Sequence, residues 1–174
     1  MKHSLAGWQV AGFLFTSVVG TLLHFAYEWS GECAVSGLFS AVNESIWEHM
    51  KLIYVPMVAF ALLQRRFAEN DRFWCIKLAG ILTALTFVPV LYYTYTGALG
   101  ISADWFNITI FFLAAGAAYY LETKLFQNSA FCAVPSGVAL GLLLLIGMLF
   151  VLFTFCTPEI PLFADPRTGR YGIR

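Results

Sequence analysis

The chain has 174 residues, of which 60% are hydrophobic and 11% are charged, and its mean hydropathy is +0.75. Soluble globular domains carry about 25% charged residues, so this composition excludes an ordinary soluble protein and indicates an integral membrane protein in contact with the lipid bilayer. Ten basic and ten acidic residues cancel, so the net charge predicts no binding to nucleic acid.

The hydrophobic pattern predicts five helices that cross the membrane. A helix needs about 20 predominantly apolar residues to cross a hydrocarbon core roughly 30 Å thick. The sequence therefore predicts an all-α, membrane-spanning bundle of about five helices in a single domain (residues 1–174). The predicted spans are 8–27, 43–64, 73–95, 105–121 and 131–155, and an irregular C-terminal tail is predicted over 157–174.

Basic residues in the connections predict the orientation of the bundle, because Lys and Arg favour the cytoplasmic side of a membrane. The first and third connections contain neither residue type, whereas the N-terminus carries Lys2. We therefore expect the N-terminus in the cytoplasm and the C-terminus outside it, even though this places the arginines of the tail outside. The second and fourth connections carry Arg65, Arg66, Arg72, Lys77 and Lys124.

The segment NESIWEHMK, Asn43 to Lys51, places a dense group of charges against the second apolar stretch. The uninterrupted apolar run that follows, Leu52 to Leu63, has 12 residues. A helix of that length extends only about 18 Å, so it needs part of the charged segment to cross the membrane. Polar side chains at that depth are costly unless they face the bundle or a wet cavity. We predict that Asn43–Lys51 is helical, lies at the extracytoplasmic end and faces the bundle interior.

Polar side chains from separate segments are expected at this outer level. His24 and Glu28 are four residues apart and share a helix face, as do Glu44 and Glu48. Imidazole and carboxylate together suit zinc, iron or manganese, although the spacing matches no established metal motif. The candidate metal ligands are His24, Glu28, Glu44, Glu48 and His49, with Glu44 and Glu48 also as candidate catalytic carboxylates. Asn43, Lys51, Asp104 and Asn107 complete the candidate polar site.

Capping and ion pairing offer a second interpretation of the same residues. Acidic residues are favoured in the first turn of a helix, and Asn43 is a good N-cap. Glu48 and Lys51, three residues apart, also suit a simple helical ion pair. Both interpretations stay open at this level.

The sequence leaves several functions open. The leading hypothesis is metal-assisted hydrolysis of a lipid or other amphiphile at an extracytoplasmic, membrane-embedded His/Glu site. One alternative is a proton- or cation-coupled transporter, for which five helices are few, so that a homodimer is expected. A non-catalytic binding or accessory protein is another, and a haem held by His24 and His49 is a weaker one.

The four cysteines divide between the two predicted sides of the membrane. Cys75 and Cys132 are expected near the cytoplasmic face, where thiols stay reduced. Cys33 and Cys156 are expected near the outer face, where disulfides form. A Cys33–Cys156 disulfide is therefore a hypothesis.

Three segments resemble a family of small bacterial integral membrane proteins of unknown function: LLHFAYEWSG, FSAVNESIWEHMKL and PLFADPRTGRYGI. The resemblance spans nearly the whole chain, and its most distinctive patterns are NESxWEHxK and DPxTGxYG. It implies a multi-pass protein of the bacterial inner membrane. It implies no activity.

Overall fold

The protein, seen in a computed structural model that describes residues 2–128, 130 and 132–173, is built from helices. The described residues form six α-helices and no strand, which confirms the predicted all-α class. The helices are α1 (Lys2–Trp29), α2 (Ala34–Gly37), α3 (Ile46–Arg65), α4 (Phe73–Leu99), α5 (Asp104–Gln127) and α6 (Ser136–Phe155), and a 3₁₀ turn, η2 (Pro161–Phe163), follows.

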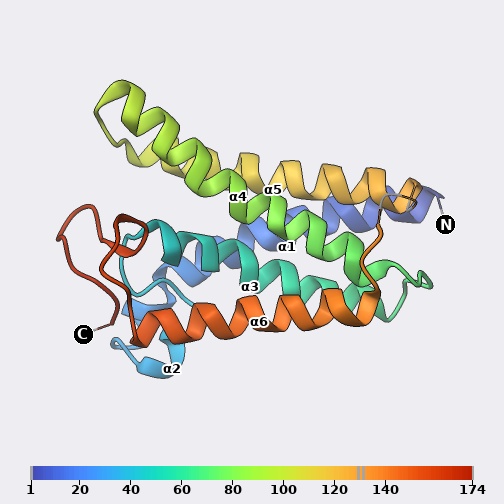
Figure 1. Ribbon diagram of the computed structural model, residues 1–174, viewed down its shortest axis with the longest axis horizontal. Coiled ribbons are helices and arrows are strands. Elements are labelled where there is room, and N and C mark those ends of the chain that lie inside the picture. Colours follow the sequence, from blue (N-terminus) through green and yellow to red (C-terminus); the bar gives the residue numbers. More distant parts are fainter. Residues whose placement is uncertain (1, 129, 131, 174) are drawn as a thin grey trace.

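The five long helices run back and forth along the long axis of the molecule (Figure 1). Helix α3 lies in the middle and packs against α1, α4 and α6, whereas α5 packs along α4 and α1. Figure 1 shows that the tips of α4 and α5 lean away from the other helices at the end where the C-terminal tail lies. The two ends of the chain lie at opposite ends of the bundle.

Four of the described helices are long and apolar enough to cross a membrane: Leu5–Trp29, Ile46–Arg65, Phe73–Leu99 and Ser136–Phe155. This finding confirms a multi-pass membrane protein. Helix α5, with 24 residues, is as long as these but is not among them. It carries Asp104, Asn107, Glu122 and Lys124, and its status as a fifth span remains a prediction.

Helix α3 begins at Ile46, three residues later than predicted. Ser45 is the N-cap: its backbone is extended, and its hydroxyl accepts a hydrogen bond from the Glu48 amide at 3.4 Å. Asn43 lies outside the helix, and its side-chain oxygen accepts a bond from the Ser45 amide at 2.9 Å. Residues 43–45 are therefore irregular, whereas 46–51 are helical as expected. The predicted last span began at Phe131, which lies outside the described residues; α6 begins at Ser136.

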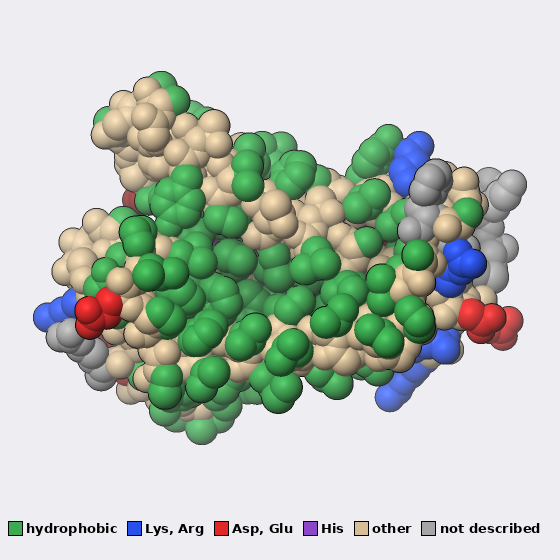
Figure 2. Space-filling model, in the orientation of Figure 1, with side chains coloured by type: hydrophobic (Ala, Val, Ile, Leu, Met, Phe, Trp, Pro, Cys, Tyr) green, Lys and Arg blue, Asp and Glu red, His purple; other side chains and the backbone are tan. Residues whose placement is uncertain are grey.

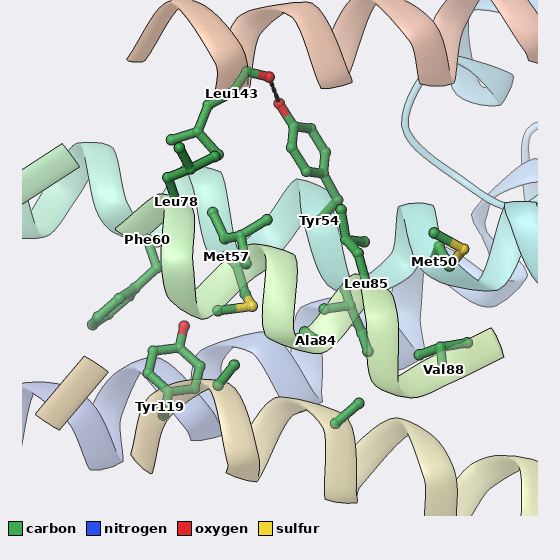
Figure 3. Packing of buried hydrophobic residues seen from close by; sticks show 14 of the residues in the cluster. Met50, Tyr54, Met57, Phe60, Leu78, Ala84, Leu85, Val88, Tyr119 and Leu143 are labelled. Atoms are coloured by element: carbon green, nitrogen blue, oxygen red, sulfur yellow. Dashed lines mark hydrogen bonds between the residues drawn. The ribbon is translucent and has the colours of Figure 1, made fainter. Parts of the chain in front are cut away.

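Apolar side chains fill the interior between α3, α4, α5 and α6 (Figure 3). Tyr54 is buried there, and its hydroxyl donates to the Leu143 carbonyl at 2.6 Å, so its polar end is satisfied. On the face that Figure 2 shows, apolar side chains also cover the middle of the molecule, while acidic and basic residues gather at the two ends. This distribution is the one expected of a bundle surrounded by hydrocarbon.

Lys77, which the sequence placed among the charges of the second connection, is not a loop residue. It lies inside α4, fully buried, and its ammonium pairs with the Glu122 carboxylate of α5 at 2.5 Å. Aromatic rings surround the ammonium, with Phe73 and Tyr119 at 5.7 and 5.6 Å. Gly80, one turn further along α4, permits this approach, since a Cβ there would stand 2.5 Å from Glu122. Lys77 is thus an interior cation, and the other loop charges carry the orientation argument.

Breaking the Lys77–Glu122 pair should destabilise the bundle more than replacing both partners. Glu122→Ala leaves the ammonium buried without a counter-ion, which should cost about 3–5 kcal/mol of unfolding free energy. Lys77→Met combined with Glu122→Leu removes both charges and should recover most of that loss. Unfolding in mixed micelles measures each variant, with Glu69→Gln, at an exposed carboxylate, as the control. An equal loss in the single and the double variant would contradict the expectation.

Candidate metal centre

Three of the five predicted ligands meet at the end of the bundle where α1 stops and α3 begins. Glu44 lies between the two histidines: its Oε1 is 3.8 Å from Nε2 of His24, and its Oε2 is 3.6 Å from Nε2 of His49. One ligating atom from each residue lies within 4.8 Å of the others. All three side chains are half-buried. The group forms an open triangle of two imidazoles and one carboxylate.

The spacing of this triangle fits a bound ion better than direct hydrogen bonds. N–H···O bonds span about 2.7–3.2 Å, and both His–Glu distances are longer. Ligand atoms around a tetrahedral zinc, with bonds near 2.1 Å, stand roughly 3.4 Å apart. The two His–Glu distances exceed this spacing by a few tenths of an ångström, and the three ligand atoms, which lie within 4.8 Å of one another, would have to draw together around an ion.

The start of α3 orients His49 toward the triangle. Nδ1 of His49 lies 2.9 Å from the Ser45 carbonyl, and this contact leaves Nε2 directed at Glu44. A backbone carbonyl behind one ring nitrogen is a common arrangement for metal-binding histidines. His24 comes from the last turns of α1, and its buried Nδ1 has no hydrogen-bond partner among the described residues.

A cavity of about 260 Å³ adjoins the triangle and is bounded partly by Glu44 and His49. Its other walls come from the start of α3, from α4, α5 and the turn between them, and from the C-terminal tail, and they mix apolar and polar groups. These walls are lined by Ile46, Val88, Tyr92, Ser102, Asp104, Asn107, Ile110, Phe111, Pro166 and Arg167. Two predicted polar residues, Asp104 and Asn107, therefore face the same space as the triangle. Metal ligands beside a cavity can meet a substrate.

Glu48 and Lys51 lie elsewhere, in a separate buried network. Their side chains are 2.7 Å apart and almost wholly inaccessible. Lys51 also donates to the Gly37 carbonyl at 2.8 Å and to the Thr154 hydroxyl at 2.9 Å, and Glu48 accepts from the Val42 amide at 3.1 Å. These contacts satisfy both charges, as the ion-pair interpretation expected. Neither residue lines the cavity.

The remaining predicted residues take other positions. Glu28 is exposed near the end of α1 and does not belong to the three-ligand group. Asn43 donates from its side-chain nitrogen to the Gly172 carbonyl at 3.2 Å, so it holds the tail. Asn107 accepts from the Tyr95 hydroxyl at 2.5 Å, which fixes the turn between α4 and α5.

The C-terminal tail folds over this end of the bundle. Phe163 is buried against Trp47, with ring centroids 4.8 Å apart, and the Ile173 amide donates to the Thr154 carbonyl at 3.1 Å. Between these anchors the chain turns back on itself, with Ala164 bridged to Tyr171. The tail places Arg167 at the cavity, where its guanidinium contacts Asp104 at 3.1 Å.

The carboxylate of Asp165 stabilises this turn. Burial opposes its charge, but it accepts hydrogen bonds from the Arg167 amide at 2.8 Å and from the Thr168 amide and hydroxyl. Together these donors hold the pKa of Asp165 below its usual value. The backbone that carries Arg167 is therefore fixed by a buried charge.

The sequence of the chain also matches a known family of proteins. A family model matches residues 1–173. The chain belongs to DUF6512, a family of unknown function. No curated protein and no solved structure matches the chain. Membership confirms the resemblance seen in the sequence, and the residues themselves carry any functional argument.

The cysteines do not form the hypothesised disulfide. All four thiols are free, with Cys33 and Cys156 exposed and Cys75 and Cys132 buried.

The sequence left open whether the arginines of the tail fold over the outer mouth of the bundle or belong to a frayed terminus. It did not place Arg167 beside His49, because 118 positions (167 − 49) separate the two. It also missed Lys77 and Glu122 as a pair. The available signals were Lys77, which lies inside the predicted span 73–95, and Glu122, an acid just beyond the predicted span 105–121.

Asp165→Asn should loosen the tail at neutral pH and have little effect in strong acid. The lowered pKa means that Asp165 stabilises the turn above the unfolded value of about 3.9, and that this contribution is lost as the pH falls through the lower folded value. Hydrogen exchange of the Arg167 and Thr168 amides, corrected for intrinsic rates, should differ between the variant and the wild type at pH 7 and converge below about pH 3. Glu159→Gln, at an exposed carboxylate in the same tail, is the control. A constant difference at all pH values would contradict the assignment.

Proposed function

We propose that the protein is a membrane-embedded, metal-dependent hydrolase that acts on a lipid or other amphiphile. The observation that carries the proposal is the triangle of His24, Glu44 and His49, which holds two imidazoles and a carboxylate slightly too far apart for hydrogen bonds beside a cavity. Two histidines and one carboxylate are also a ligand set of catalytic zinc, which keeps its fourth position for water.

The chemistry of the ligands favours zinc, with iron and manganese as alternatives. A bound zinc ion would lower the pKa of a coordinated water to about 7 and so supply a nucleophile at neutral pH. Glu44 would neutralise one of its two charges, and the Ser45 carbonyl behind His49 would keep that ring in the coordinating orientation.

The residues across the cavity would position the substrate and move protons. Glu44 and Glu48 were the two candidate catalytic carboxylates from the sequence, but Glu44 belongs to the triangle and Glu48 pairs with Lys51. Asp104 supports this role better, because it lines the cavity and is largely exposed there. Tyr92 and Ser102 add hydroxyl groups to the same wall. A base in the same cavity as the nucleophile is the arrangement that hydrolysis requires.

The surroundings of the cavity favour an amphiphilic substrate. Trp29 and Trp105 are both exposed at this end of the bundle, as aromatic residues are at the boundary between hydrocarbon and headgroups. Apolar side chains, among them Val88 and Phe111, line the cavity together with its polar groups. A molecule with an apolar part and a polar headgroup meets both kinds of wall.

The alternatives differ from this proposal in what they require. A haem would need the two imidazoles on opposite faces of its ring, whereas His24 and His49 flank one carboxylate. A binding or accessory protein should tolerate Glu44→Gln without loss of cellular function. A transporter needs a pathway between the two ends of the bundle, and the homodimer expected for it stays a prediction.

Purified protein should retain about one equivalent of zinc per chain. His24→Ala and His49→Ala should each lose most of it, because two remaining ligands hold zinc weakly, and the double variant, which keeps only Glu44, should lose all of it. Elemental analysis measures the metal, and absorption by substituted cobalt reports its nitrogen and oxygen ligands. Glu28→Gln, at a nearby exposed carboxylate of α1, is the matched control and should keep full occupancy. Wild-type protein without stoichiometric metal, under conditions that load an established zinc enzyme, would rule out the proposal.

The metal site is also proposed to face away from the cytoplasm, in the inner membrane of a bacterium. Exposed Cys33 and Cys156 lie at the same end of the bundle as the cavity, next to α2 and after α6. A membrane-impermeant thiol reagent added to intact spheroplasts should label both, and labelling should disappear in the Cys33→Ser, Cys156→Ser double variant. Labelling that requires disruption of the membrane would reverse the proposed orientation.

A further inference from the structure

Arg167 is the one permanent cation among the described residues that line the cavity. Its neighbours there include two acids, Glu44 and Asp104. The hydrogen bond to Asp104, followed by the charge of Glu44, raises the pKa of the guanidinium, so Arg167 is charged at every physiological pH. Arg167 therefore interacts electrostatically with Glu44 of the triangle as well as with Asp104 on the opposite wall.

The tail holds the backbone of Arg167 firmly. On one side Phe163 is buried against Trp47, and on the other the Gly172 carbonyl accepts from Asn43. The Asp165 carboxylate then accepts a hydrogen bond from the Arg167 amide itself. Three independent anchors therefore fix the point from which the guanidinium reaches the cavity.

The guanidinium, by contrast, is weakly held. Its pair with Asp104 is exposed on both sides, at 60% for Arg167 and 77% for Asp104. Ion pairs of this kind contribute little to stability, because water competes for both partners. The pair is also made through one nitrogen, Nη2, and one carboxylate oxygen. An oxyanion that offers two acceptors to the planar guanidinium would bind it better.

The charge balance of the proposed site favours such an anion. A divalent ion on the triangle carries two positive charges, of which Glu44 cancels one, while Arg167 and Asp104 cancel each other. The occupied cavity would then carry a net charge of about +1. A neutral or cationic headgroup would gain nothing from this field, whereas an oxyanion would be attracted by the metal and could displace Asp104 from Arg167.

We propose that Arg167 binds the headgroup of the substrate and selects amphiphiles with an oxyanion headgroup, a phosphate or a carboxylate. This inference rests on the proposed function, since it names the substrate class of the same site. The apolar chain of the ligand would lie along the apolar walls of the cavity, and the oxyanion would lie between the guanidinium and the triangle. Asp104, once released by Arg167, would be free to act on water.

Equilibrium binding of radiolabelled dodecyl phosphate to the protein in phosphatidylcholine nanodiscs tests the inference. Arg167→Gln should raise the dissociation constant by about tenfold or more, since it removes a charge-assisted hydrogen-bonding partner. Asp104→Asn should lower it, because the guanidinium is then no longer paired. Arg170→Gln, at an exposed arginine of the same turn, is the matched control and should bind like the wild type. Thermal unfolding checks that each variant is folded.

Three competing ligands show which parts of dodecyl phosphate, the oxyanion or the apolar chain, the protein recognises. Dodecanoate should compete with dodecyl phosphate, whereas zwitterionic dodecyl phosphocholine and free inorganic phosphate should compete far more weakly. Unchanged binding by Arg167→Gln, or equal competition by the zwitterion, would overturn the selection by Arg167. Equal competition by inorganic phosphate would show that the protein does not recognise the apolar chain, and would overturn the inference that its ligand is an amphiphile.

Zinc content, measured on the same samples, keeps this inference apart from the proposed function. Retained zinc with normal binding by Arg167→Gln overturns the headgroup role and leaves the metal centre intact. If the protein contains no zinc but its binding of dodecyl phosphate still depends on Arg167, the hydrolase proposal is ruled out, and the cavity remains an oxyanion-binding site.

Discussion

The buried ion pair of Glu48 and Lys51 connects most of the segments at the cavity end of the bundle. Its partners are the Gly37 carbonyl and the Val42 amide from the connection after α1, and the Thr154 hydroxyl from α6. The carbonyl of Thr154 in turn accepts from the tail. Hydrocarbon offers no water to solvate these charges, so each must find its partners within the protein. The cavity walls on α3 and the tail thereby take their positions from one pair of charges.

The helical repeat distributes the segment NESIWEHMK among different tasks. Glu48 and Lys51 lie three residues apart and face α6, His49 faces the end of α1, and Trp47 packs against the tail. Glu44 precedes the helix, so the N-cap at Ser45, rather than helical spacing, decides where its carboxylate lies. The ion pair and the candidate metal ligand His49, which belong to the two interpretations that the sequence left open, therefore lie on different faces of the same turn.

Hydrophobic stretches of membrane length predicted the long helices. The limits of these stretches also predicted that His24, Glu44 and His49 lie at the same end of the bundle. Local spacing also offered the pairing of Glu48 with Lys51 as one of two interpretations. It did not separate Glu48 from the three candidate ligands that meet, because a sequence shows which residues share a helix face but not which neighbouring helix that face meets. Arg167 and the pair of Lys77 with Glu122 depend on contacts between segments that are distant in the chain, and no local pattern encodes them.

The contact between Gly80 and Glu122 also limits how the protein can move. The carboxyl side chain of α5 lies against the bare backbone of α4, while its charge is held by Lys77 one turn away. Sliding or rotating either helix alone would separate a charge pair inside the membrane, at a cost far above thermal energy. Further along the same two helices, Val88 and Tyr92 of α4 and Asp104 and Asn107 of α5 line the cavity. A displacement of one of these helices would therefore have to carry the other with it, because the buried charges of Lys77 and Glu122 must stay together.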